Sequence, residues 1–264
     1  MRPLAVLCIA FLFYGAGSQD KKIQSAVKQL EELKTRNVFD RGPAEGTLIS
    51  IGEPAVPAVL QLLKSENELT RHAAAEILTN LAVSRKKPVH LGFSETVLRN
   101  DVLPALTAAL KDPSEWARAP VIGALFNIAQ LDEESGKTII PLLTGALSDP
   151  AAEIRSNAAN CLGEIGPRAK EALPALVEAL QRPDSREYDR VVFAVRNIGP
   201  GPEAVPGLIT ALTAKDRMTR QMAAEALGKI GPPAQAAVPA LREAVANKSI
   251  GKAGTEALQK IEAK

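Results

Sequence analysis

The chain is poor in the side chains that most catalytic and metal-binding sites use. It has two cysteines, two histidines and one tryptophan, and aromatic residues make up 3% of its sequence. Cys8 lies in an apolar run near the start, so Cys161 is the only cysteine left beyond it and no intramolecular disulfide can form there. Neither His72 nor His90 is followed by glutamate, and the sequence contains no Ser-His-Asp elbow, phosphate loop or CxxC pair. We therefore expect no cofactor, no bound metal and no enzymatic activity.

The charge balance gives no electrostatic signature of a nucleic-acid partner. The chain has 32 basic and 30 acidic side chains and a formal net charge of +2. A nucleic-acid-binding domain typically carries a clear excess of basic residues on one face. Hydrophobic residues make up 46% of the sequence, and Ala, Leu and Val supply most of them. Together with the low aromatic content, this favours closely packed helices over an aromatic-rich β-sandwich.

The N-terminal stretch differs from the rest of the sequence. Arg2 gives a short positive start, residues 4–14 form an apolar run without charge, and residues 16–18 offer small side chains for cleavage. This pattern predicts a secretory signal peptide at residues 1–18, followed by a repeat domain at residues 19–264. A retained membrane anchor is the alternative, although the apolar run is short for a transmembrane helix. We expect a periplasmic or secreted protein that is not inserted in a membrane after cleavage.

The rest of the chain is repetitive. Residues 155–174 (RSNAANCLGEIGPRAKEALP) and residues 220–239 (RQMAAEALGKIGPPAQAAVP) align without a gap. Fixed-period repetition of this kind is typical of solenoid proteins. The same pattern predicts repeats near residues 20–52, 54–82, 102–129, 139–166, 169–199, 204–231 and 236–261, with an insertion at residues 83–100.

Each repeat carries the signals of two helices. An early proline costs little, because the first amides of a helix have no partner within it. Such a proline marks six of the predicted first helices: Pro57, Pro104, Pro141, Pro174, Pro206 and Pro239. Ile-Gly-Pro ends three of the second helices, since glycine adopts the left-handed cap and proline cannot continue the helix. Pro43 and Pro120 stand where a helix interior should reject them, so we expect a kink or a late start at both.

The motifs Pro-Ala-Leu, Asp-Pro, Arg, Ala-Ala and Leu-Gly-x-Ile-Gly recur in this order from about residue 20 to residue 261. The pattern resembles HEAT repeats, specifically the short bacterial type named for phycobilisome lyases. The resemblance implies an all-α fold, a right-handed α-solenoid (superhelix) of about seven HEAT-like helical hairpins. It also implies that the second helices line a concave face.

An arginine recurs near the start of the second helices, at Arg41, Arg71, Arg118, Arg155 and Arg220. In two repeats an aspartate precedes it by six residues, as Asp112/Arg118 and Asp149/Arg155, and this pair resembles the turn-to-helix bond of the family. We interpret the series as a structural ladder. Binding of carboxylates or phosphates in a row is the alternative interpretation.

Residues one, five and nine positions after the arginine share one helical face, the polar stripe, which the resemblance places on the concave side. Its members are His72, Glu76, Asn80, Ala119, Gly123, Asn127, Ser156, Asn160, Glu164, Asp189, Phe193, Asn197, Gln221, Glu225 and Lys229. Asparagine is a mediocre helix former, so its recurrence indicates hydrogen bonding to an extended partner, and a solvated face is the alternative. Trp116 and Tyr188 add aromatic side chains of the kind that anchor interfaces, although Trp116 could equally pack within its turn.

These features predict an exported, non-catalytic scaffold that binds a protein or an extended peptide, in an oligomeric state that the sequence leaves open. The predicted contact residues are His72, Glu76, Asn80, Trp116, Asn127, Asn160, Glu164, Tyr188, Phe193 and Asn197. The resemblance implies an alternative, a lyase-like or chaperone factor for a tetrapyrrole-bearing protein. A di-metal hydroxylase built from HEAT pairs is a third hypothesis, but its His-Glu ligand motifs are missing here.

Overall fold

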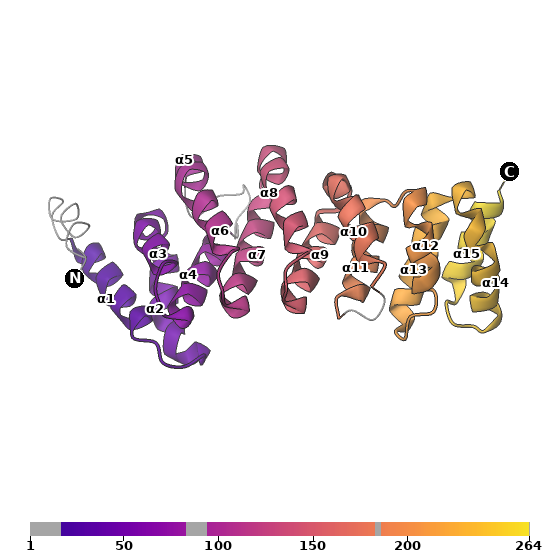
Figure 1. Cartoon of the computed structure of the whole chain (residues 1–264). Helices are drawn as coiled ribbons and strands as arrows, with labels where there is room; N and C mark the ends of the chain where they lie inside the picture. The colour runs from indigo at the N-terminus through magenta and orange to yellow at the C-terminus, as the bar shows by residue number, and fades with distance from the viewer. Residues whose placement is uncertain (1–16, 83–93, 183–185, 264) are drawn as a thin grey trace. The chain divides into compact units, whose positions relative to one another are not determined.

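The computed structural model of the chain describes residues 17–82, 94–182 and 186–263, which Figure 1 traces from the N-terminus to the C-terminus. All regular secondary structure in these residues is helical, and they contain no β-strand. The chain divides into two compact units, Met1–Ala105 (unit 1) and Leu106–Lys264 (unit 2), and each is a stack of helices. This architecture confirms the all-α, solenoid-type fold class expected from the sequence.

Unit 1 begins with two helical pairs, in which α1 packs against α2 and α3 packs against α4, while α2 also packs against α4. Residues 83–93 of the predicted insertion lie outside the described residues. The residues that follow are helical, and the last helix crosses into unit 2. In chain order these elements are α1 (Ser18–Glu31), α2 (Val38–Ile51), η1 (Glu53–Ala55), α3 (Val56–Leu62), α4 (Glu68–Leu81), α5 (Glu95–Val97), η2 (Leu98–Val102) and α6 (Leu103–Ala109).

In unit 2 each second helix packs against the second helix of the next pair, in the order α7, α9, α11, α13 and α15. The first helices α8, α10, α12 and α14 each pack against the second helix that follows them. The elements are α7 (Glu115–Ala129), α8 (Glu133–Ala146), α9 (Ala152–Ile165), η3 (Gly166–Ala172), α10 (Leu173–Ala179), α11 (Tyr188–Ile198), η4 (Pro202–Ala204), α12 (Val205–Ala211), α13 (Arg217–Ile230), η5 (Pro232–Ala237), α14 (Val238–Ala246) and α15 (Lys252–Glu262).

Small side chains allow the second helices to approach one another closely. Ala158 and Ala159 of α9, and Ala223 and Ala224 of α13, are fully buried. At Gly163 the approach is closest, because a Cβ atom there would lie 2.7 Å from the Phe193 ring of α11. Branched side chains such as Leu162 fill the remaining space, and burial of this apolar surface is the main stabilising contribution to such a seam.

Glycine ends the second helices as the sequence predicts. α9, α11 and α13 stop at an isoleucine, and the glycines that follow, Gly166, Gly199 and Gly231, have φ of 67°, 104° and 70°. Gly52 ends α2 in the same way, with φ of 77°. These positive φ angles are costly for other residues, so each glycine fixes the point at which the chain turns towards the next repeat.

Of the kink or late start expected at Pro43 and Pro120, the late start is wrong. α2 begins at Val38 and α7 at Glu115, and both helices run past Pro43 and Pro120. A side-chain cap fixes each starting point, because Asn37 accepts a hydrogen bond from Phe39 N and Ser114 accepts one from Ala117 N. Each proline then removes only one hydrogen bond from a helix that is already capped.

The expectation that proline stands early in the first helices holds for most repeats but not for all of them. Pro57, Pro174, Pro206 and Pro239 occupy one of the first two helical positions. Pro141 lies in the interior of α8, because the Asp132 carboxylate accepts a hydrogen bond from Ser135 N and starts this helix at Glu133.

Candidate protein-binding face

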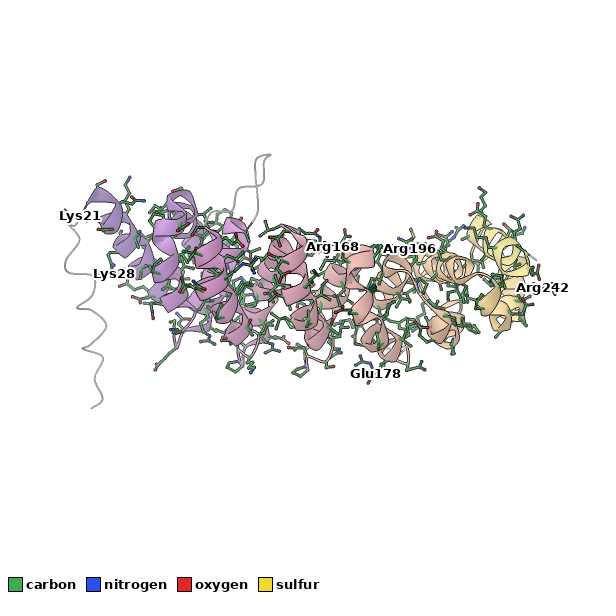
Figure 2. The ribbon with its side chains drawn as sticks, turned by 90° about the horizontal axis from the view of Figure 1, so that it is seen from above. Lys21, Lys28, Arg168, Glu178, Arg196 and Arg242 are labelled. Carbon is green, nitrogen blue, oxygen red and sulfur yellow. The ribbon has the colours of Figure 1, made fainter. Side chains whose placement is uncertain are left out.

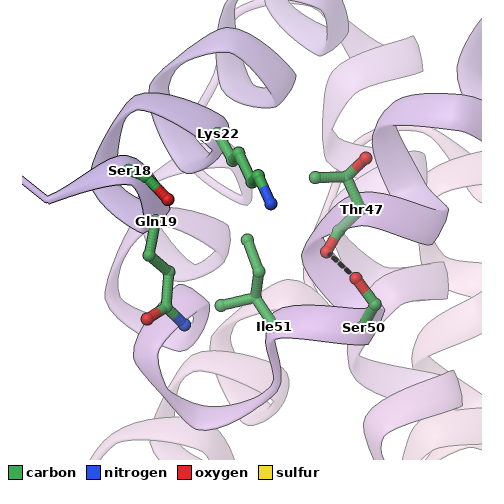
Figure 3. A pocket seen from close by; sticks show the side chains of 6 residues that line it. All are labelled: Ser18, Gln19, Lys22, Thr47, Ser50 and Ile51. Atoms are coloured by element: carbon green, nitrogen blue, oxygen red, sulfur yellow. Dashed lines mark hydrogen bonds between the residues drawn. The ribbon is translucent and has the colours of Figure 1, made fainter.

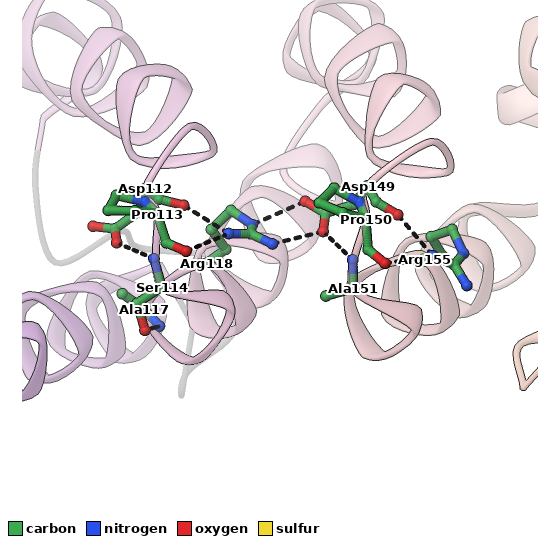
Figure 4. A network of polar contacts seen from close by, with 9 residues as sticks. All are labelled: Asp112, Pro113, Ser114, Ala117, Arg118, Asp149, Pro150, Ala151 and Arg155. Atoms are coloured by element: carbon green, nitrogen blue, oxygen red, sulfur yellow. Dashed lines mark hydrogen bonds and ion pairs between the residues drawn. The ribbon is translucent and has the colours of Figure 1, made fainter.

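The recurring arginines of unit 2 connect successive repeats (Figure 4). Arg118, at the start of α7, donates from Nη1 to the backbone oxygen of Asp112, at 2.6 Å, in its own turn. Its Nε and Nη2 donate to the two carboxylate oxygens of Asp149 in the following turn, at 2.9 and 2.7 Å. Arg118 and Asp149 side chains are only 8% and 11% exposed. A bidentate pair of this kind fixes the distance and the angle between two groups, so Arg118 holds two repeats in register.

This geometry corrects the turn-to-helix pair expected from the spacing of six residues. The Asp112 carboxylate does not accept the bond from Arg118 but receives the Ser114 amide at 2.8 Å, which shapes its own turn. Asp149 likewise accepts the Ala151 amide at 2.8 Å. The arginine donates to backbone carbonyls within its own repeat and to a carboxylate in the next one, because its side chain is long enough to reach the following turn.

The next step of the ladder uses a glutamate that the motif did not predict. Arg155 donates from Nη1 to the backbone oxygen of Asp149 at 2.8 Å, and from Nε to the Glu187 carboxylate at 2.6 Å. Burial alone would raise the pKa of Glu187, but the hydrogen bonds from Arg155 and the charge of that residue hold it below its usual value. Glu187 is therefore an ionised, buried acceptor. It accepts the bond from Arg155 as Asp149 accepts the bond from Arg118.

Two of the remaining ladder arginines, Arg220 and Arg71, keep the bonds to their own turns. Arg220 donates to the backbone oxygens of Ala214 and Lys215 at 2.7 and 2.8 Å, and Arg71 donates to those of Ser65 and Glu66 at 2.8 and 3.0 Å. In unit 1, Arg41 pairs with Glu45, with 3.4 Å between Nε and Oε1 and side chains 7% and 15% exposed. The structure thus supports the ladder interpretation over an exposed row of anion-binding groups.

The polar stripe lies on the second helices, and in unit 2 it runs over α7, α9, α11 and α13. Most of its members there are half-buried, whereas Glu164, Asp189, Glu225 and Lys229 are exposed. Figure 2 shows that Arg196, on the second helix α11, and Glu178, on the first helix α10, project to opposite sides of unit 2. The second helices therefore present a face of their own, with polar side chains at its surface.

Two predicted contact residues do not lie at the surface. His72 is 6% exposed and Tyr188 is 5% exposed, so their placement on an exposed face is wrong. Tyr188 occupies the ladder position of its repeat, and its hydroxyl donates to the backbone oxygen of Gly207 at 3.3 Å. Burial raises the pKa of Tyr188 to about 12. His72 Nε2 lies 3.5 Å from Glu76 Oε1, and this hydrogen bond is the main cause that lowers the pKa of Glu76.

The asparagines of the stripe serve the fold to different degrees. Asn197 donates to the backbone oxygen of Gly163 in α9 at 3.4 Å, and Asn80 donates to that of Glu76 at 2.9 Å. Asn160 accepts a bond from Arg190 Nη1 at 3.3 Å, which leaves its amide nitrogen available. Asn127 is half-buried in α7. Helix-to-helix bonding therefore accounts for part of the recurrence of asparagine that the sequence analysis noticed.

The Phe193 side chain is half-buried, so it packs within the fold and also reaches the surface. Its ring lies against Gly163, and the Arg196 guanidinium carbon lies 5.7 Å from the ring centroid, a cation–π arrangement. Arg196 Nη1 also donates to Glu225 of α13 at 2.7 Å, and Lys229 donates to the Arg196 backbone oxygen at 2.8 Å. Sequence reasoning missed Arg196 and Arg190, because they fall outside the offsets of one, five and nine. No distinct signal in the sequence marks them, because α11 has two arginines and α13 has two as well.

Trp116 is half-buried at the start of α7, two residues before Arg118. Residues at this same position in other repeats include the two most exposed large apolar side chains of the described residues, Phe39 at 84% and Met218 at 60%. Trp116 therefore lies at the turn edge of its repeat rather than on the polar stripe.

A separate pocket of about 660 Å³ opens in unit 1 between the start of α1 and the end of α2 (Figure 3). Its lining combines one cation with hydroxyl and amide groups, supplied by Ser18, Gln19, Lys22, Thr47, Ser50 and Ile51. Both hydroxyls of α2 donate to backbone oxygens of their own helix, Thr47 to Pro43 and Ser50 to Thr47, each at 2.8 Å. No residue predicted for binding lies in this pocket.

The described residues also limit other kinds of site. Among residues 17–82, 94–182 and 186–263, no three His, Cys, Asp or Glu side chains come together in an arrangement that could hold a metal ion. In the same part of the chain, no helix is both long and apolar enough to cross a lipid bilayer. The predicted signal peptide falls mainly on residues 1–16, which lie outside the described residues.

Cys161 is buried, and burial raises the pKa of its thiol to about 12.

Comparison with known proteins identifies the repeats. The family profile described as HEAT repeats matches residues 103–196 and 188–259, and that described as armadillo/beta-catenin-like repeat matches residues 43–83. A search of the curated proteins found no match to this chain.

Solved structures share the fold. An engineered protein is 23% identical to this chain over 79% of it and 96% of its own length, with a TM-score of 0.57. A second engineered protein reaches a TM-score of 0.62 at 21% identity, over 91% of this chain and 68% of its own. A designed armadillo repeat protein in complex with the peptide (KR)4 has a TM-score of 0.55 at 20% identity, over 79% of this chain and 99% of its own. At these identities the likeness concerns the fold alone.

Proposed function

Because this chain belongs to the HEAT-repeat family, whose profile matches more than half of its length, we propose that it is a non-catalytic scaffold that binds a protein segment on its second helices. The observation that carries the proposal is the polar stripe of unit 2. Four consecutive second helices display half-buried or exposed polar side chains there, each helix packed on the next. A designed armadillo protein of similar fold holds an extended peptide, which supports this kind of partner.

The arginine ladder makes such a surface suitable for recognition. Arg118 and Arg155 each join two repeats through short, largely buried bonds, so the spacing between stripe residues of successive helices is fixed before a partner arrives. A preorganised surface loses less conformational entropy on binding than a mobile one. Half-buried amides such as Asn160 can then bond to the backbone of an extended segment, while exposed carboxylates such as Glu164 select its side chains.

The test places a photo-crosslinking side chain at Asn160 or Glu164 and, as matched controls, at Glu178 on α10 and Lys137 on α8. The two control positions are exposed and belong to first helices. A polypeptide captured at the stripe positions, and not at the controls, is identified, and a synthetic copy of the linked segment is titrated against the protein. Equal capture at all four positions contradicts the proposal.

Two further variants test whether aromatic side chains contribute to binding of the captured segment. Trp116→Ala and Phe193→Ala are compared with wild type for binding of the captured segment, after thermal melting has shown that each variant is folded. Since Phe193 packs on Gly163, its replacement should cost stability as well as affinity. If both variants bind as tightly as wild type, neither aromatic side chain belongs to the binding face.

Export is part of the same proposal. Arg2, the apolar run at residues 4–14 and the small residues at 16–18 support a signal peptide, and the proposed location is the periplasm or the extracellular medium. The motif order supports the phycobilisome-lyase-like type of HEAT repeat. N-terminal sequencing of the protein recovered from its native host should find a start near residue 19, and a start at Met1 contradicts export by cleavage.

A further inference from the structure

One edge of unit 2 is formed by the turns that join each first helix to its second helix (Figure 1), and three exposed cations lie in or directly beside the last two of these turns. Lys215 lies in the α12–α13 turn, Arg217 is the first residue of α13, and Lys248 lies in the α14–α15 turn. All three side chains are exposed. Within the part of the chain that the structure describes, none of them forms an ion pair. Met218, beside Arg217, is 60% exposed.

The two turns belong to one surface. A Cβ atom placed on Gly251, in the α14–α15 turn, would lie 3.8 Å from Arg217 Nη2 and 3.5 Å from Gln221 Nε2. Arg220 Nε donates to the backbone oxygen of Ser249 in that turn at 3.4 Å. The start of α13 therefore rests directly against the turn that carries Lys248.

The one acidic side chain of these turns, Asp216, is exposed between Lys215 and Arg217. Asp216 accepts hydrogen bonds from the Thr219 amide and hydroxyl, at 2.7 and 2.9 Å, and these bonds lower its pKa. The backbone oxygens of Ala214 and Lys215 are occupied by Arg220. Asp216 therefore caps α13 as an ionised, exposed carboxylate, and because three cations lie around it the edge keeps a net positive charge.

The preceding turn extends the same character. Arg182 and Arg186 are exposed on either side of residues 183–185, which lie outside the described residues. The acidic residue between them in the sequence belongs to that segment, so the site defined here, the basic edge, consists only of Lys215, Arg217, Met218 and Lys248.

We propose that the basic edge docks unit 2 on an anionic phospholipid membrane. Its three cations and its apolar side chain are exposed, and they lie in two adjoining turns and at the start of α13, where a broad anionic surface can contact them. An acidic peptide would lack walls to hold it there. Cations near an anionic leaflet each contribute favourably, and an exposed apolar side chain gains when it leaves water for the interface. This surface is separate from the polar stripe, so membrane docking leaves the stripe free for its partner.

The experiment measures co-sedimentation of the full chain with vesicles of phosphatidylcholine alone or mixed with phosphatidylglycerol. Any contribution of residues 1–18 is the same in every variant, and the uncharged vesicles report it. The triple variant Lys215→Gln/Arg217→Gln/Lys248→Gln should lose about fivefold in partitioning per cation, or about a hundredfold in total. Met218→Ser should lower binding severalfold, and high salt should abolish the difference between wild type and the triple variant.

A matched control removes the same charge elsewhere. Lys137→Gln/Lys170→Gln/Lys260→Gln neutralises three exposed lysines away from this edge, and should keep binding within about twofold of wild type. The proposal is overturned if both triple variants bind equally, or if binding does not require phosphatidylglycerol. It is also overturned if the basic edge binds a glutamate-rich peptide but no vesicle.

Discussion

At Gly163 the helices α9 and α11 are so close that a single added carbon has nowhere to go. A Cβ atom would lie 2.7 Å from the Phe193 ring and 2.9 Å from the Ala194 Cα atom. The ring can turn aside, but the backbone atom moves only if the two helices separate. Since these helices carry the centre of the polar stripe, this contact sets both local stability and the spacing of the proposed binding face.

Gly163→Ala should therefore destabilise the protein by about 1–3 kcal/mol, the usual cost of overpacking a tight core. Gly145→Ala is the matched control, because no atom lies within 4 Å of its added Cβ, and alanine favours a helix over glycine by about 0.5–1 kcal/mol. Denaturant unfolding of both variants provides the comparison. Equal stability of the two variants would show that α9 and α11 are further apart than described.

The thiol of Cys161 gives a second residue-scale prediction. Burial raises its pKa to about 12, and only the thiolate reacts readily with disulfide reagents. In a Cys8→Ser background, the native protein should resist labelling at neutral and mildly alkaline pH, and unfolding should release one reactive thiol. Rapid stoichiometric labelling of the folded protein would contradict the burial of this side chain.

At the scale of the element, the ladder is the feature that joins one hairpin to the next. Arg118 and Asp149 form a bidentate pair with side chains 8% and 11% exposed, a setting in which charge-assisted hydrogen bonds are strong. A double-mutant cycle with Arg118→Met and Asp149→Asn should give a coupling energy of about 2 kcal/mol. The exposed pair Arg242–Glu262, 67% and 40% exposed, should couple by no more than about 1 kcal/mol. Equal coupling energies in the two cycles would contradict a structural role for the Arg118–Asp149 pair.

Glu187 makes the second ladder step sensitive to pH. Its pKa is lowered in the folded protein from an ordinary value of 4.5, with burial opposing and the Arg155 bonds favouring the shift. A lowered carboxyl pKa contributes stability that is present above the unfolded pKa and is lost as the pH falls through the folded pKa. Glu187→Gln should cost about 1.5–3 kcal/mol at neutral pH, and the difference from wild type should shrink from about pH 5 towards about pH 3.

Unfolding measured across this pH range checks the prediction. Glu133→Gln, which changes an exposed carboxylate paired with Lys137, should leave the pH dependence unchanged. A constant difference between Glu187→Gln and wild type at every pH would mean that Glu187 is not ionised in its buried site.

The ladder also shows how far the sequence alone could reach. The positions of Arg118, Arg155 and Arg220 were predictable because they recur at a fixed place in the repeat. The direction of their bonds was not, because the Asp149 carboxylate lies 31 residues from Arg118 in the chain and only the stacking of repeats brings the two together. Glu187 had no motif to reveal it, since it directly precedes the ladder position Tyr188 and does not lie six residues before it, where Asp112 and Asp149 stand in their repeats.

For the predicted contact residues too, the sequence revealed what a single helix determines and not what depends on neighbouring helices. Helical periodicity correctly put Asn160 and Glu164 on one face of α9, because that face depends only on the geometry of a single helix. It could not show that His72 and Tyr188 are buried, since neighbouring helices cover them. Nor could it show that Phe193 packs on Gly163, a contact that depends on the separation of two helices.

At the scale of the whole molecule, the proposed scaffold has two surfaces. In unit 2 the polar stripe follows the second helices, while the basic edge follows the turns at their ends, so the two can be occupied at once. Family membership and fold supply the framework, and the assignment of a protein partner to the stripe is the central claim.

Backbone hydrogen exchange with and without the segment captured at the stripe tests that claim most directly. We expect slower exchange in α7, α9, α11 and α13 when the segment is bound, and little change in α8, α10 and α12. Protection confined to these first helices, with none on the second helices, would contradict it.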